Sequence, residues 1–332
     1  MPLALKLQLE ISLRFRNIFK GYACKFGNFD LADLLIDLTS CTSLASSLCM
    51  HYALSSKIEF SFKISRIIKK ILNKIKNSDI VLLNQALNTK DHDDFTLLHI
   101  SIQNDYYELA QILIEEYSNM INIPAGADQN LPIHLAAQNG SIRIFDLLVK
   151  HKAKISATNA KSENCLHIAA NANKQEFIKH FLSVELKINS NNLCCKATNL
   201  YQFTPLMSAA FAGSLEAIKE LTTTNTTYDI GYKDIDDHSI FHLCAKKNRL
   251  TCFSYLIENV LQNSEVLINV LGQKDKYDNT ILHIVCFYGY YDMLTFILRK
   301  MSTNQNLIFR KNYYEQSCFH LCCKEGHDRI AK

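Results

Sequence analysis

Residues 131–137 read Leu-Pro-Ile-His-Leu-Ala-Ala, and residues 204–210 repeat the pattern as Thr-Pro-Leu-Met-Ser-Ala-Ala. The centre of each stretch is an anchor position between two residues that are apolar or small. Five further triplets complete the set of anchors, which are His99, His134, His167, Met207, His242, His283 and His320. The separations of 35, 33, 40, 35, 41 and 37 residues indicate a repeated supersecondary unit, with the extra length in residues 183–200 and 259–276.

The residues around each anchor predict a helix, a turn and a second helix. A side chain that can cap a helix stands three positions before the anchor, and Pro132 and Pro205 follow it in the first turn, where a missing N–H costs nothing. The capping residues are Thr96, Asn164, Thr204, Ser239, Thr280 and Ser317, with Leu131 the one departure. Small residues such as Ala136 and Ala209 then permit close helix packing. Turn glycines follow at Gly140, Gly213, Gly289 and Gly326.

These features resemble the ankyrin family, whose signature is Thr-Pro-Leu-His-x-Ala-Ala. The resemblance implies an all-α solenoid of stacked antiparallel helix pairs, with β-hairpin fingers formed by the polar stretches 91–94, 161–164, 233–237 and 275–279. The register assigns about seven repeats to residues 93–332, the last one truncated. Residues 63–92 are expected to form a degenerate capping unit, with 64–75 as its first helix and 80–87 as its second. Residues 1–62 show no repeat and are expected to be a helical leader of uncertain structure.

Composition and charge exclude several classes of function. The chain has 332 residues and a net charge of +4, and most of the excess of Lys and Arg lies in residues 1–76, so the repeats are close to neutral and predict no nucleic-acid partner. The longest uncharged stretch, 38–56, is rich in Ser and Thr and is not expected to span a membrane. The twelve cysteines form no CxxC pair and are expected to be reduced, as in the cytosol. Cys194 and Cys195 lie in an insertion and could be exposed and oxidisable, but we favour a bystander role.

The recurring anchor histidines could suggest a metal site. Stacked units would place them about 10 Å apart, however, which is too far for them to share one ion. The resemblance implies a structural role, in which each ring hydrogen-bonds backbone and stabilises a turn. The one locally plausible zinc set is His320, Cys322, Cys323 and His327. Its spacing matches no common zinc finger, and repeat positions account for two of its members. We therefore expect no metal, no cofactor and, in the absence of any catalytic motif, no enzyme.

The stretch 63–76 is basic, with isoleucines at helical spacing. It could lie on an anionic membrane surface or bind calmodulin. We favour a capping helix with a solvated basic face, because its apolar stripe is needed to cover the first full repeat.

The function expected is protein binding through fingers and inner helices. The succession of an anchor without His at Met207, the triplet at His242, a long connection through Lys274 and the triplet at His283 resembles the cytosolic ankyrin array of transient receptor potential channels of the ankyrin (TRPA) subfamily. That resemblance covers residues 80–332 and implies a cytosolic domain of a membrane cation channel involved in ion transport and sensory gating. It also implies that further repeats and the transmembrane domain lie downstream, so that the chain is part of something longer. The alternative is a stand-alone cytosolic adaptor, and a third reading is an array fused to a catalytic domain.

Overall fold

The computed structural model describes residues 36–37, 40, 49–54, 61–188, 193–223, 230–261, 264–301 and 305–331, and most of the expected leader lies outside them. These residues form helices joined by turns, with no β-strand among them. The chain divides into two compact units, residues 1–160 and 161–332, which are described separately. The all-α expectation is therefore confirmed.

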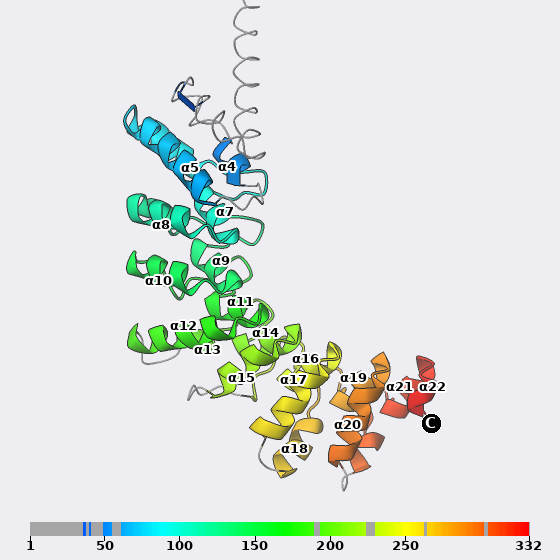
Figure 1. The fold of residues 1–332 in the computed structure, drawn as a ribbon. Helices are drawn as coiled ribbons and strands as arrows, with labels where there is room; N and C mark the ends of the chain where they lie inside the picture. Colours follow the sequence, from blue (N-terminus) through cyan, green and yellow to red (C-terminus); the bar gives the residue numbers. More distant parts are fainter. Residues whose placement is uncertain are drawn as a thin grey trace, which may run out of the picture. The chain divides into compact units, whose positions relative to one another are not determined.

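The first unit contains two complete helix pairs of the expected repeat, formed by its last four α-helices. Its elements are α4 (Cys49–Leu54), α5 (Ser61–Lys76), α6 (Ile80–Asn88), α7 (Leu97–Gln103), α8 (Tyr107–Glu116), the 3₁₀ turn η1 (Ser118–Met120), α9 (Pro132–Asn139) and α10 (Ile142–Lys150). Helices α7 and α9 pack side by side in one row, and α8 and α10 in the other (Figure 1). Each pair is thus stacked on the next, as the repeat pattern predicts.

The region before Asp91 is arranged differently from the expected order. Helix α4 packs against α7, and α5 packs against α8, so α4 and α5 continue the rows of first and second helices. Helix α6 is an additional element that packs against α5. The sequence had suggested 64–75 as a first helix, because the short α4 carries no periodic pattern that would reveal it.

The basic stretch 63–76 lies within α5, and its isoleucine face is buried. Ile64, Ile68 and Ile75 have no exposed surface. Lys69 pairs with Glu116 at 3.5 Å, and Lys70 with Asp37 at 3.0 Å. The apolar face of α5 is thus used within the protein, which favours the capping interpretation over a lipid-facing one.

The second unit carries the remaining repeats. Its elements are α11 (Cys165–Asn171), α12 (Gln175–Ile188), α13 (Leu193–Lys196), α14 (Pro205–Ala212), α15 (Leu215–Thr223), α16 (Ile240–Lys246), α17 (Leu250–Tyr255), the π-helical turn η2 (Leu256–Val260), α18 (Ser264–Leu271), α19 (Ile281–Tyr288), α20 (Tyr291–Met301), the 3₁₀ turn η3 (Gln305–Phe309), α21 (Cys318–Lys324) and α22 (Asp328–Ala331). Helices α11, α14, α16, α19 and α21 pack consecutively, and α12, α15, α17 and α20 form the second row (Figure 1).

Small residues let the first helices approach closely. Ala209, Ala210 and Ala245 are completely buried, as is Cys244. The turn that follows each first helix contains a residue with positive φ six positions after the anchor. These residues are Asp105, Gly140, Asn173, Gly213, Asn248, Gly289 and Gly326. Asp and Asn tolerate this left-handed conformation better than other non-glycine residues, which explains why three units dispense with glycine.

The two long connections and the fingers depart from expectation. Residues 183–200 extend α12 and add α13, and Cys194 is buried there rather than exposed, with its N–H donating to Glu185 at 2.9 Å. The β-hairpin fingers are not confirmed: the described part has only two isolated bridges, Ala125 with Asn130 and Lys233 with Ser239. None of the described helices is long and apolar enough to cross a bilayer.

Candidate functional site

Five of the finger loops share one hydrogen-bonded turn, which begins with Asp or Asn eight residues before the anchor. In the loop of Asp275, Oδ1 accepts the N–H groups of Tyr277 and Asn279, both at 2.8 Å. The equivalent first residues, with the same two acceptor bonds, are Asp91, Asn199, Asp234 and Asn312. The fourth loop residue, such as Asp278, has positive φ. The two bonds to Oδ1 offset the strain of that conformation, about 1–2 kcal/mol.

Consecutive loops are joined by one backbone bond each rather than by a ladder. The N–H of Lys276 donates to Asp236 at 2.9 Å, and that of Tyr313 donates to Tyr277 at 2.9 Å. Ile235 donates to Tyr201 in the same way, at 3.3 Å. These single links explain why the fingers contain no extended strand.

The anchor histidines connect each first helix to the following loop. His134 Nδ1 accepts the N–H of Leu131 at 3.1 Å, so Nε2 carries the proton and donates to the carbonyl of Ala157 at 3.0 Å. His283 likewise accepts from Thr280 at 3.1 Å and donates to Gln316 at 3.0 Å. His99 and His167 make the equivalent contacts to the carbonyls of Asn130 and Phe203.

Burial makes these rings neutral. Burial lowers the pKa of His99, His167 and His242 to about 4, although hydrogen bonds to backbone groups act in the opposite direction. Burial also lowers the pKa of His134 and His283. Among the described anchors, His242 differs in that its buried Nε2 has no hydrogen-bond partner. Met207 has no ring, and its N–H donates to Thr204 Oγ1 at 3.3 Å.

The predicted capping residues occupy the positions directly before six of the first helices. They are Thr96, Asn164, Thr204, Ser239, Thr280 and Ser317, before α7, α11, α14, α16, α19 and α21. Four of them place a hydroxyl 2.7–2.8 Å from Nδ1 of the anchor three residues on. Asn164 places Oδ1 2.7 Å from His167 Nδ1, whereas the anchor after Thr204 is Met207 and has no ring. Cap and anchor therefore form one local hydrogen-bonded pair.

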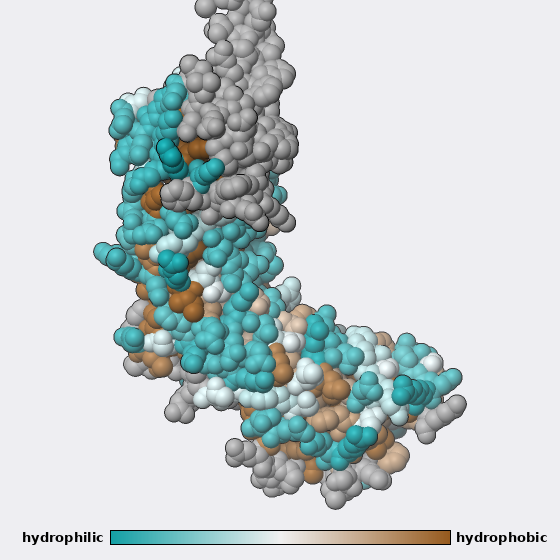
Figure 2. All heavy atoms as spheres, in the orientation of Figure 1, coloured by the Kyte–Doolittle hydropathy of each residue, from teal (hydrophilic) through white to brown (hydrophobic). Residues whose placement is uncertain are grey.

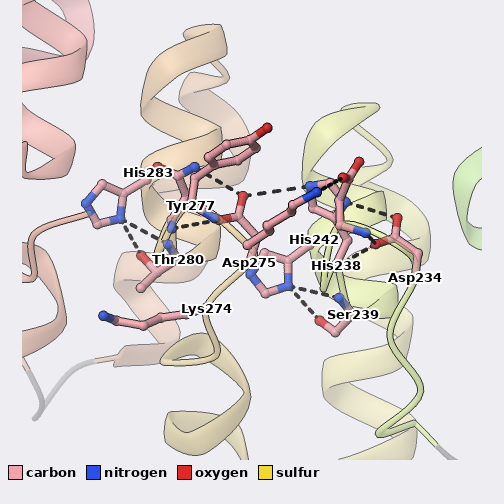
Figure 3. Close-up of polar contacts among 12 residues, drawn as sticks. Asp234, His238, Ser239, His242, Lys274, Asp275, Tyr277, Thr280 and His283 are labelled. Atoms are coloured by element: carbon pink, nitrogen blue, oxygen red, sulfur yellow. Dashed lines mark hydrogen bonds and ion pairs between the residues drawn. The ribbon is translucent and has the colours of Figure 1, made fainter. Parts of the chain in front are cut away.

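Sequence reasoning missed a polar row that crosses three consecutive loops in the second unit. His238 Nδ1 lies 3.0 Å from Asp234 Oδ2 in its own loop, and Nε2 faces Asp275 Oδ2 of the next loop at 3.8 Å (Figure 3). Asn279 Nδ2 then donates to Asp275 Oδ2 at 3.1 Å, and Asn312 Nδ2 donates to Asn279 Oδ1 at 2.9 Å. The row is a pre-organised polar surface.

Electrostatics reinforce this row at its acidic end. Burial alone would raise the pKa of Asp234, but hydrogen bonds from the His238 ring and from the N–H groups of His238 and Asp236 outweigh it and leave the pKa below its ordinary value. Asp234 is therefore an ionised, buried carboxylate at neutral pH. Its contribution to stability is present above the ordinary carboxyl pKa and is lost as pH falls through the lowered value.

A cleft of about 510 Å³ lies above this row. His238, Asp275, Asn279 and Asn312 contribute to its lining from the loops, and helices α16, α19 and α21 contribute the opposite side. The other lining residues are mainly aromatic and basic: the exposed Tyr277, Phe287, Tyr288, Tyr314 and Lys324, and the half-buried Lys246. Tyr277, Phe287 and Tyr288 are 47%, 41% and 43% exposed. Over the yellow and orange part of Figure 1, hydrophobic patches stand among hydrophilic ones in Figure 2.

The structure does not bring together the zinc set that the sequence suggested locally but did not favour. His320 Nδ1 is engaged by Ser317, and His327 Nε2 lies 3.0 Å from the carbonyl of Phe287. Cys322 is buried, whereas Cys323 is exposed. No group of three or more metal-ligating side chains occurs in the part of the chain that the structure describes.

The sequence matches the family of ankyrin repeats over residues 63–159 and 133–234 in its three-copy form, and over residues 229–298 in its many-copy form. Similar proteins include Ankyrin repeat protein nuc-2 of Neurospora crassa, 31% identical over 172 residues, which are 52% of this chain and 15% of that protein. Transient receptor potential cation channel subfamily A member 1 of Homo sapiens is 24% identical over 252 residues, 74% of this chain and 21% of that protein. The Caenorhabditis elegans homolog of that channel is 24% identical over 194 residues, 50% of this chain and 15% of that protein. The chain thus spans about a fifth or less of these relatives.

Proposed function

This chain belongs to the ankyrin-repeat family, and from that premise we propose that it is a non-enzymatic scaffold that binds protein partners in the cleft between its finger loops and helices α16, α19 and α21. The observation that carries the proposal is the exposure of Tyr277, Phe287 and Tyr288 around a cleft whose loop side is the hydrogen-bonded polar row. Aromatic side chains supply large contact area with little loss of conformational entropy, and they are enriched at protein interfaces. The turns before each anchor serve as the fingers.

Capture experiments with the full chain test this proposal. A cleft variant carries Tyr277→Ser, Phe287→Ser and Tyr288→Ser, and a control carries Leu186→Ser, Val266→Ser and Phe309→Ser, three exposed apolar residues that do not line the cleft. Proteins from the source organism bound to immobilised chain are identified by mass spectrometry. Partners lost with the cleft variant and kept with the control support the proposal. Equal capture by both variants contradicts it.

Within this function, we propose as the host protein a TRPA-type cation channel, whose cytosolic array this chain would form on the cytoplasmic face of a membrane. The observation that favours it is the alignment with the human channel over 74% of this chain. The alternative is a stand-alone cytoplasmic adaptor. Sequencing the complete transcript separates the two, because a channel requires apolar segments of about 20 residues downstream. A transcript with no such segments overturns the channel proposal, and a catalytic signature in their place supports the third reading.

A further inference from the structure

The position four residues after each anchor lies at the exposed end of the first helix and carries a pattern in the second unit. Successive helices α14, α16, α19 and α21 place Phe211, Lys246, Phe287 and Lys324 there. The corresponding residues are Gln103 and Gln138 in the first unit and Asn171 in α11, the first helix of the second unit, so the pattern begins at α14. Aromatic and cationic side chains thus alternate along the helices that form the cleft.

The lysines of this alternation are available to a ligand. Within the residues that the structure describes, Lys246 and Lys324 have no ion-pair partner, whereas Lys219, Lys274, Lys300 and Lys311 each pair with a carboxylate. The carboxylates of the cleft are engaged elsewhere, since Asp236 lies 3.8 Å from Lys276 and Asp275 belongs to the polar row. The cleft therefore offers two lysines that have no ion-pair partner among the described residues, beside the two carboxylates that are already engaged.

Of the two aromatic residues, Phe287 is the one that faces the cleft. Phe211 is covered by Lys247, whose Nζ lies 4.6 Å from the ring centre, and it does not line the cleft. Phe287 is 41% exposed and packs edge to face on Tyr288 at 5.0 Å. The part of the pattern that a ligand can reach is therefore the row formed by Lys246, Phe287 and Lys324 on three neighbouring helices. Tyr277 and Tyr314 lie on the loop side of the cleft.

The spacing of this pattern matches that of an extended polyproline II segment. Packed helices stand about 8–10 Å apart, so the three side chains recur at roughly that interval. A polyproline II segment has three residues per turn and rises about 3.1 Å per residue, so every third side chain lies on one face at an interval of about 9 Å. A β-strand places residues i and i+3 on opposite faces and cannot present the same row.

We infer that the partner is an acidic polyproline II segment with an apolar residue three positions from an acidic residue on either side, and this inference rests on the proposed function. The two carboxylates meet Lys246 and Lys324, and the apolar residue packs on Phe287 between Tyr288 and Tyr277. Aromatic-lined grooves are a known means of binding this conformation. Because one lysine lies on each side of Phe287, the two lysines complement the two acidic residues in either direction of the bound segment.

The test uses the complete chain and fluorescently labelled peptides, with dissociation constants from fluorescence anisotropy. The chain should bind Glu-Pro-Pro-Phe-Pro-Pro-Glu more tightly than Lys-Pro-Pro-Phe-Pro-Pro-Lys and more tightly than the misaligned Glu-Pro-Phe-Pro-Pro-Pro-Glu. Lys246→Gln and Lys324→Gln should each weaken binding about two- to fivefold, the range of one exposed ion pair. Lys300→Gln, which removes a lysine outside the cleft, is the matched control and should leave the affinity unchanged.

A charge reversal makes the outcome decisive. The double variant Lys246→Glu, Lys324→Glu should prefer the lysine peptide, and raised salt should weaken both matched pairs. Equal affinity for the aligned and misaligned peptides, or no switch on charge reversal, overturns the inference. If capture depends on Tyr277, Phe287 and Tyr288 but not on either lysine, the proposed function stands and the acidic partner class is wrong. If capture does not depend on the cleft aromatics, the proposed function itself fails.

Discussion

The ring of His238 and the carboxylate of Asp275 face each other at 3.8 Å although they belong to different finger loops, and both side chains are less than 10% exposed. His238 is also bonded to Asp234 at 3.0 Å, so one imidazole lies between two buried carboxylates (Figure 3). Asn279 occupies the same loop position one repeat later, where it donates to the carboxylate of its own loop and accepts Asn312 Nδ2 from the next loop. Comparing these two loops therefore indicates what a histidine contributes at this position that an asparagine does not.

That comparison predicts the effect of changing His238. His238→Asn keeps a donor for Asp234 and should lower the free energy of unfolding by about 1 kcal/mol, the value of one hydrogen bond. His238→Leu leaves a buried carboxylate without its partner and should cost about 3 kcal/mol. Hydrogen exchange of the amides in residues 234–238 and 275–279 measures the local effect. Equal protection in the two variants would mean that His238 acts by filling space alone.

The neutral anchor histidines predict a loss of stability in mild acid. His99, His167 and His242 have folded-state pKa values of about 4, below the ordinary 6.5, so the unfolded chain takes up more protons between these values. Their contribution is complete above pH 6.5 and declines as pH falls toward 4, by about 1.4 kcal/mol per pH unit for each ring. Melting temperatures measured from pH 8 to 4 check this. His167→Gln should flatten the decline, and an unchanged slope would contradict the assignment.

Much of the fold was predictable because the repeat is encoded locally. The anchor His134, Pro132 before it and Gly140 after it specify helix start and turn without reference to the rest of the chain. The loops follow a local rule too. An Asp or Asn eight residues before the anchor accepts two hydrogen bonds from backbone N–H groups of its own loop. This five-residue turn takes the place of the expected hairpin.

The cleft was less predictable, because it depends on contacts between repeats. Lys246 and Phe287 line the same cleft only because α16 packs against α19. Likewise, nothing in the immediate sequence of His238 indicates that Asp275, 37 positions later in the numbering, faces it. Helix α4 was missed for the same reason, since its place is set by packing against α7.

Two turn glycines provide a matched pair of substitutions. Gly289 and Gly326 both have φ of 74°, but a Cβ on Gly289 would lie 2.7 Å from the His327 ring, whereas a Cβ on Gly326 meets nothing within 4 Å. Gly326→Ala should therefore cost only the left-handed strain, about 1–2 kcal/mol. Gly289→Ala should cost about 1–3 kcal/mol more through overpacking, and it should displace His327 from the Phe287 carbonyl. Thermal melting of both variants measures the difference, and equal shifts would refute the close approach.

Asn130 and Asn122 test the links between loops in the first unit. Asn130 Oδ1 accepts Asn159 Nδ2 from the next loop at 3.0 Å. Asn130→Ala should therefore lower stability by about 1 kcal/mol, whereas Asn122→Ala, at an exposed position, should stay within about 0.5 kcal/mol of the original protein. Urea unfolding distinguishes the two, and similar midpoints would show that the bond between the two loops contributes no stability.

Met207 is the one anchor without an imidazole, and restoring the ring tests the repeat rule in the direction of gain. Met207 is 2% exposed and follows Thr204 by three residues, which is the spacing between cap and anchor in the other units. In Met207→His, Nδ1 should meet Thr204 and Nε2 should donate to the carbonyl of His238, the counterpart of Phe203 for His167. One added hydrogen bond and a repeat-consensus residue should raise stability by about 0.5–2 kcal/mol. The reverse change, His167→Met, is the control and should lower it. A destabilised Met207→His variant with an unprotected loop at 234–238 would show that this position requires an apolar side chain, because a second imidazole beside His238 leaves a buried nitrogen without a partner.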